Sequence, residues 1–205
     1  APGIRLQGDT MASYGLTLFS ENHPIVQESG RVYANGSASL DAGSADITLD
    51  SPDNVFYTVG STTVSGGNVR IAASTPLSFG DVNATGQLHL SPGGSIPDVE
   101  FRGRTVAADI LIDGDLWVYA PSSTAESVKG NLTLSGRLIF GSGFTSQVFN
   151  GDISGASSLY MEGTAATEAL NGRTQVAGPT HASGGTLLIG DATHPGALLQ
   201  SDALV

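Results

Sequence analysis

The sequence contains no cysteine, a single lysine at Lys129 and no long run of apolar residues. The absence of cysteine excludes a disulfide framework and thiolate metal sites. A membrane-spanning helix needs about 18 consecutive apolar residues, and no apolar run here is that long. No segment is therefore expected to span a bilayer. Acidic residues number 19 against 8 basic ones, and the formal net charge is −11. A field of that sign repels phosphate backbones, so nucleic acid is not an expected partner.

Signals for long helices are also missing. A helix would show apolar residues three and four positions apart over about 12 residues. Every stretch with such spacing is interrupted by glycine, proline or a cluster of β-branched residues. Glycine instead makes up 28 of the 205 residues, about twice its average usage. Glycine and serine end most apolar runs after a few residues, which is typical of short strands joined by turns. With 40% apolar residues the chain is not expected to be disordered.

A triplet of apolar residue, spacer and apolar residue returns seven times, and it organises the sequence. Successive triplets begin 22, 19, 22, 22, 27 and 28 residues apart. Alternation at a period of two indicates a strand with one buried face, and a repeat of this length indicates a solenoid. The pattern predicts an all-β solenoid, a parallel β-helix of roughly nine coils of about 20–28 residues. The triplets are Ile47–Leu49, Val69–Ile71, Leu88–Leu90, Ile110–Ile112, Leu132–Leu134, Leu159–Met161 and Leu187–Ile189.

No linker divides the chain, so residues 1–205 are predicted to form one β-helical segment. Residues 1–45 carry the least regular pattern. Several coils have a second strand, as in Leu116-Trp117-Val118, after a Gly-containing corner. The spacer residues predict outward ladders. One ladder joins Glu100, Trp117 and Ile139, and another joins Thr48, Arg70, His89, Leu111, Thr133, Tyr160 and Leu188.

Two stretches resemble a known family. Residues 45–94 contain Val-Ser-Gly-Gly-Asn-Val, Leu-Ser-Phe-Gly-Asp-Val and Gly-Gln-Leu-His-Leu. These elements are similar to the coil repeats of bacterial autotransporter passengers and filamentous haemagglutinin-like exoproteins. Residues 153–196, with Gly-Gly-Thr-Leu at 184–187, resemble the passenger-associated repeat of autotransporters. We predict that this repeat occupies residues 153–205.

The resemblance implies a right-handed β-helix that is exported through the outer membrane of a Gram-negative bacterium and displayed on the cell surface or released. Most such passengers are adhesins or self-associating virulence proteins. The implied role is non-catalytic, in cell adhesion or self-association, with a host-cell surface protein or glycan as partner. The chain begins at Ala1 without an initiator methionine or signal sequence, so we expect it to be a piece of a longer protein. A purely structural stalk for a domain outside this chain remains an alternative.

An enzymatic alternative depends on three acids. Asp109, Asp113 and Asp115 cluster around one predicted strand, and paired carboxylates serve as general acid and base in glycosidases or bind Ca²⁺. A polysaccharide lyase would also need a basic residue near the acids. The candidates are Arg102 and Arg104, which precede that strand. The competing interpretation is that the acids cap a strand and a corner. Five Gly-Asp pairs, at 8–9, 80–81, 114–115, 151–152 and 190–191, are likewise interpreted as corners.

Motifs for other chemistry are lacking. The sequence has no Gly-x-Ser-x-Gly elbow, no Gly-Asp-Ser-Gly and no phosphate-binding loop, so no catalytic residue and no cofactor is predicted. His23, His89, His181 and His194 are far apart and show no metal-ligand spacing.

One pair of side chains is a candidate for surface contact. If Leu116 and Val118 point inward, Trp117 and Tyr119 point outward from the same coil. Such a pair suits stacking on sugar rings or packing in a protein interface. The alternative is that a neighbouring loop covers both rings.

Overall fold

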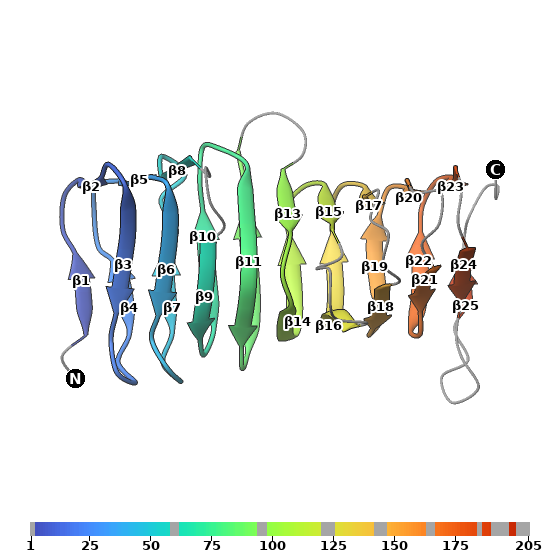
Figure 1. Ribbon diagram of the computed structural model, residues 1–205, viewed down its shortest axis with the longest axis horizontal. Helices are drawn as coiled ribbons and strands as arrows, with labels where there is room; N and C mark the ends of the chain where they lie inside the picture. The colour runs from blue at the N-terminus through green and yellow to red at the C-terminus, as the bar shows by residue number, and fades with distance from the viewer. Residues whose placement is uncertain are drawn as a thin grey trace.

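The computed structural model describes residues 3–57, 62–93, 98–119, 126–141, 147–162, 167–183, 186–189 and 197–199. These residues form an all-β solenoid of parallel strands with no helix among them. The strands stack side by side from the N-terminal to the C-terminal end of the molecule (Figure 1). The predicted all-β solenoid is therefore confirmed, while its right-handed sense, its number of coils and its status as one domain stay predictions.

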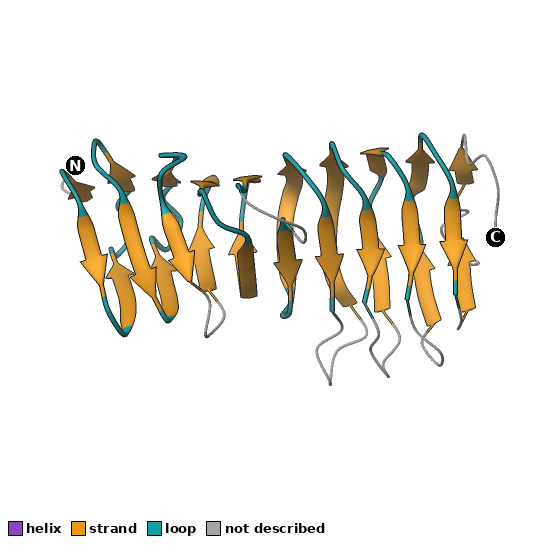
Figure 2. Cartoon of the chain, turned by 90° about the horizontal axis from the view of Figure 1, so that it is seen from above, coloured by secondary structure: helices purple, strands orange, loops and turns teal. Residues whose placement is uncertain are grey.

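The strands of successive coils form three rows, named A, B and C in the order in which the chain first visits them (Figure 2). Row A contains β1 (Ile4–Leu6), β4 (Ile25–Gln27), β7 (Ile47–Leu49), β10 (Val69–Ala72), β12 (Gln87–Ser91), the second halves of β14 (Thr105–Ile112) and β16 (Glu126–Leu134), β19 (Ile153–Ala156), β22 (Arg173–Val176) and β25 (Ala197–Leu199).

Row B has two sections. The first is a separate sheet of β2 (Thr10–Ala12), β5 (Val32–Asn35) and β8 (Val55–Tyr57). The second contains the first half of β11 (Leu77–Ala84), β13 (Val99–Phe101), β15 (Leu116–Val118), β17 (Leu138–Phe140), β20 (Leu159–Met161) and β23 (Thr180–Ala182).

Row C contains β3 (Gly15–Phe19), β6 (Ser37–Asp41), β9 (Thr62–Gly66), the second half of β11, the first halves of β14 and β16, β18 (Gln147–Asn150), β21 (Thr167–Leu170) and β24 (Thr186–Ile189). In β14 and β16 the corner between rows C and A is made without a break in the strand, at a shift of register between Val106 and Asp109.

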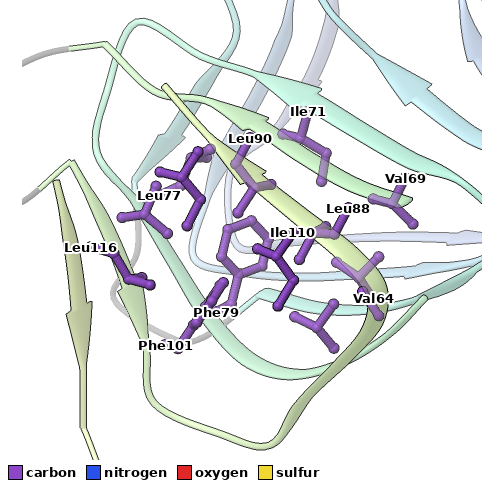
Figure 3. Packing of buried hydrophobic residues seen from close by; sticks show 14 of the residues in the cluster. Val64, Val69, Ile71, Leu77, Phe79, Leu88, Leu90, Phe101, Ile110 and Leu116 are labelled. Carbon is purple, nitrogen blue, oxygen red and sulfur yellow. The ribbon is translucent and has the colours of Figure 1, made fainter. Parts of the chain in front are cut away.

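The hydrophobic core lies inside the coils, where the inward residues of the three rows meet. Leu88, Leu90 and Ile110 of row A approach Phe79 and Phe101 of row B from the other side (Figure 3). The rings of Phe79 and Phe101 meet edge to face at 6.2 Å, an arrangement that aromatic pairs prefer. Each coil buries its inward face within the coil and against its neighbouring coils, as expected of a solenoid.

The seven apolar triplets do not share one row. The prediction that their seven spacer residues form one outward ladder is therefore wrong. The first five triplets are in register in row A. Leu159–Met161 lies in row B and Leu187–Ile189 in row C. Row A instead continues from Leu132 through Ile153 to Thr174, which is fully buried. The longer spacings of 27 and 28 residues therefore mark changes of row. The apolar pattern does not show the row A position at Thr174, because the inward residue there is a threonine.

Residues 3–45 form the same three rows as the other described residues. Ile4, Ile25 and Ile47 are in register in row A, at spacings of 21 and 22 residues. Their less regular sequence pattern does not correspond to a less regular stacking of strands.

Four Gly-Asp pairs lie directly against a Gly-Arg pair of the next coil. In each case the aspartate Oδ1 accepts a hydrogen bond from the arginine main-chain N–H, at 2.6–3.1 Å. The two glycines approach so closely that a Cβ on the second would collide with the main chain of the first. The interpretation of these pairs as corners is confirmed at four of the five, and residues 190–191 lie outside the described residues. The pairs are Asp9–Arg31, Asp81–Arg104, Asp115–Arg137 and Asp152–Arg173.

Candidate functional site

Trp117 and Tyr119 point away from the core of their coil, as predicted. Leu116 and Val118 are buried at 0% and 1% exposure, whereas the two aromatic residues are half-buried. Their rings stack on each other with centroids 5.9 Å apart and planes inclined by 27°. The pair therefore presents one combined aromatic surface.

Arg102 and Glu100 of the preceding coil border Tyr119. The Arg102 guanidinium lies 5.0 Å from the centre of the Tyr119 ring, and its Nη2 lies 2.8 Å from Glu100 Oε2. Burial raises the pKa of Tyr119, and the negative charges of Glu100 and Glu162 act in the same direction, while Arg102 opposes them. Gly141 lies on the next coil, and a Cβ atom there would collide with the Tyr119 ring.

The outward ladder of Glu100, Trp117 and Ile139 is confirmed by the register of row B. The ladder continues through Tyr160 to His181, whose rings stack at 4.7 Å and 16°. Although Ile139 points outward, it is only 2% exposed, because its neighbours along the ladder are the large rings of Trp117 and Tyr160. We call Trp117, Tyr119, Ile139, Tyr160 and His181 the aromatic face.

The aromatic face extends over several coils, which suits a broad and shallow contact. It contains one unsatisfied polar atom, since Trp117 Nε1 is buried without a hydrogen-bond partner in the described part of the chain. Tyrosine and tryptophan combine a large apolar surface with a polar group, and both are enriched where proteins bind partners.

The three acids of the enzymatic alternative bind three different partners. Asp109 accepts a hydrogen bond from Asn131 Nδ2 at 3.1 Å. Asp115 is 8% exposed and forms an ion pair with Arg137 at 2.6 Å. Asp113 lies against His89. Arg102 binds Glu100 rather than any of these acids. Each carboxylate therefore has its own partner, and no residue binds all three.

Asp113, Ser91 and His89 form a small polar cluster on the outer side of row A. Ser91 Oγ donates to Asp113 Oδ2 at 2.5 Å, and His89 Nε2 lies 3.0 Å from the same oxygen and 3.3 Å from Ser91 Oγ. In a nucleophilic triad the acid holds the ring nitrogen opposite the one that faces the serine. Here one histidine nitrogen contacts both residues, so the geometry is not that of a triad.

The histidines do not converge. His23, His89 and His181 lie on different coils, and His194 lies outside the described residues. Within the described ranges no group of three His, Cys, Asp or Glu side chains could hold a metal ion.

Two hollows were not predicted from the sequence. The larger, about 620 Å³, lies at the corner after row A and is lined by Asp9, Glu28, Asp50 and Asp53 together with Arg31. Three of these carboxylates already have arginine partners, in Arg31, Arg5 and Arg70. The smaller hollow, about 370 Å³, lies on the outer side of row C. The sequence signal that could have located it is the run of small polar spacer residues in β6 and β9.

Comparison with known families gives one partial match. Residues 3–63 are similar to a family described as "Repeats of unknown function (DUF5649)". No curated protein and no solved structure matches the chain. The match covers β1 to the start of β9, so it supports a repetitive solenoid protein and leaves the activity open.

Proposed function

We propose that this chain is a non-catalytic, surface-exposed segment of a secreted adhesin, of the autotransporter or filamentous haemagglutinin-like type. The observation that carries the proposal is the aromatic face, a half-buried aromatic surface that crosses several coils of the solenoid. The resemblance of residues 45–94 and 153–196 to passenger repeats supports this class, and the match to repeats of unknown function fits its repetitive solenoid.

The proposed location is the surface of a Gram-negative bacterium or the surrounding medium, after export through the outer membrane. In the described part of the chain, no helix has the length and apolarity that crossing a bilayer requires. The proposed partners are a host-cell surface protein or glycan, or a second copy of the chain.

The proposal is tested by the double variant Trp117→Ala/Tyr119→Ala in the parent protein displayed on cells. Both side chains point outward, so the far-ultraviolet dichroism spectrum should stay that of a β-protein. Adhesion or cell–cell association should weaken, because removing a central aromatic anchor typically costs about 2 kcal/mol or more.

The matched control is Tyr14→Ala, which removes a tyrosine that is 96% exposed and lies on a different part of the solenoid. The control should adhere like the wild-type protein. Equal adhesion by the double variant and the wild type would contradict the proposed contact surface. Undiminished adhesion after deletion of residues 1–205 would instead favour a stalk that supports a binding domain elsewhere in the protein.

A further inference from the structure

The smaller hollow is a groove on the outer side of row C, across strands β6, β9 and β11. Its volume is about 370 Å³. Small serines occupy successive coils here, and the exposed ring of Phe19 lies one coil before Asp41 in the same ladder. The groove residues are Ser39, Leu40, Asp41, Thr63, Val64, Ser65, Asp81 and Asn83.

Four of the groove residues carry hydroxyl or amide groups that have no partner among the described residues. Within the described chain, the side chains of Ser39, Thr63, Ser65 and Asn83 make no hydrogen bond, although they lie on adjoining strands. Neighbouring parallel strands are about 4.8 Å apart, so these groups repeat along the groove at that interval. A ligand with many hydroxyl groups could satisfy several of them at once.

The two groove carboxylates are held in place by main-chain groups. Asp41 Oδ1 accepts a hydrogen bond from the Gly43 N–H, and Asp81 Oδ1 accepts one from the Arg104 N–H, both at 2.9 Å. The Oδ2 atom of each carboxylate has no such partner in the described chain. Acceptors that are already oriented bind donors at a lower entropic cost, and a charged acceptor forms the stronger hydrogen bond.

Charge and shape indicate which ligand fits. No basic side chain lines the groove, and two carboxylates do, so an anionic ligand would be repelled. The apolar groove residues Leu40 and Val64 are themselves buried, so the groove lacks the apolar pocket on which protein partners usually depend. Phe19 is 63% exposed, and an aromatic ring at the edge of a polar groove can stack against the C–H face of a sugar.

From these observations we infer that the groove over β6, β9 and β11 is a binding site for an uncharged glycan chain. Sugar hydroxyls donate to Asp41 and Asp81 and bind Ser39, Ser65 and Asn83, while Phe19 stacks on a ring at the end. This site is distinct from the aromatic face, and it does not depend on the proposed role in adhesion.

The test uses the purified chain and four hexasaccharide probes. Three are uncharged, namely cellohexaose, mannohexaose and N-acetylchitohexaose, and the fourth is the anionic hyaluronan hexasaccharide. At least one uncharged probe should shift the amide resonances of β6, β9 and β11 in nuclear magnetic resonance spectra, and hyaluronan should not. Calorimetric titration then measures the Kd of the probe that binds best.

Variants of the groove should weaken that binding. Asn83→Ala and Phe19→Ala should each raise the Kd about tenfold, the usual effect of losing one good hydrogen bond or one stacking contact. Ser65→Leu should abolish binding by filling the groove. The control Thr48→Ala, which removes an outward hydroxyl of row A, should leave the Kd unchanged, as should Trp117→Ala.

Three results would overturn the inference. The first is no shift from any uncharged probe at millimolar concentration. The second is binding of hyaluronan that equals or exceeds that of the uncharged probes. The third is a probe that binds but shifts resonances around Trp117 instead of the groove, or that binds the groove variants as well as the wild type.

Discussion

At the scale of single residues, the threonines inside the solenoid are the least expected part of the core. Thr105, Thr174 and Thr180 are fully buried, and the Oγ1 atoms of Thr105 and Thr174 lack a hydrogen-bond partner among the described residues. A buried polar group without a partner costs about 1–3 kcal/mol. Thr105 and Thr174 are therefore positions where a buried hydroxyl group lowers the stability of the fold.

Thr105→Val should stabilise the protein. Thr105 lies between Val82 and Val128 in row C, so a methyl group would meet apolar neighbours on both sides. The expected gain is about 1–2 kcal/mol in the free energy of unfolding, measured by denaturant titration. Thr48→Val, on the outer side of row A, serves as control and should change stability little. A lower midpoint for Thr105→Val would show that the site needs its hydroxyl.

The pKa of Asp113 predicts a small effect of pH on stability. The hydrogen bond from Ser91, with a smaller contribution from His89, holds this pKa below its usual value of 3.8. Because the unfolded state then binds the proton more readily, the stabilising contribution is complete above that value and is lost as the pH falls through the folded-state pKa. Asp113 is 52% exposed, so the contribution should stay below about 1 kcal/mol.

Ser91→Ala should raise the pKa of Asp113 toward its usual value, as followed by a carboxyl-carbon titration in nuclear magnetic resonance. The control variant Thr63→Ala removes a hydroxyl of row C and should leave the Asp113 titration unchanged. An unchanged Asp113 titration in Ser91→Ala would mean that the hydroxyl does not stabilise the carboxylate.

At the scale of strands and corners, the Gly-Asp and Gly-Arg pairs connect successive coils. The environment of the aspartate differs from one pair to the next. The Asp115 side chain is 11% exposed and accepts hydrogen bonds from the main-chain N–H and the guanidinium of Arg137. The Asp9 side chain is 53% exposed, and its ion pair with Arg31 is longer, at 3.4 Å. The same sequence motif should therefore contribute differently at the two corners.

Asp115→Ala should cost about 2–3 kcal/mol of unfolding free energy, because it leaves an arginine and a main-chain N–H without their acceptor. Asp9→Ala at the equivalent exposed corner should cost about 1 kcal/mol or less. Denaturant midpoints of the two variants make the comparison. Equal losses would contradict the view that burial decides the strength of this motif.

At the scale of the whole molecule, acidic residues outnumber basic ones by 19 to 8, and most of the described arginines are paired. Arg5, Arg31, Arg70, Arg102 and Arg137 all form ion pairs with carboxylates. The described surface therefore presents no cluster of free basic side chains, and its formal net charge of −11 should repel polyanions.

The protein should pass through a heparin column without retention at about 0.1 M salt, where charges beyond about 10 Å are screened. Retention should also be absent at about 0.01 M salt, because lower screening strengthens the repulsion. Positively charged lysozyme run on the same column is the control for column function. Elution of the solenoid only above about 0.3 M salt would reveal a basic surface and contradict this prediction.

The local features of this protein could be predicted from the sequence. Alternating apolar residues specify strands, and glycine next to aspartate specifies corners, because both depend on the geometry of a few consecutive residues. The inward direction of Leu116 and Val118, and with it the outward direction of Trp117 and Tyr119, follows from the same period of two. The register of the first five triplets could also be predicted from the sequence, because they begin 19 to 22 residues apart.

The tertiary structure alone decided which strand lies on which. Thr174 takes an inward position in row A that an apolar pattern does not reveal, and Leu159 belongs to row B, because the lengths of the connections determine where each coil closes. The three acids around Ile110 are neighbours in sequence, but each binds a different residue about one coil away. The groove on row C depends on side chains about 20 residues apart, which come together only because the coils stack.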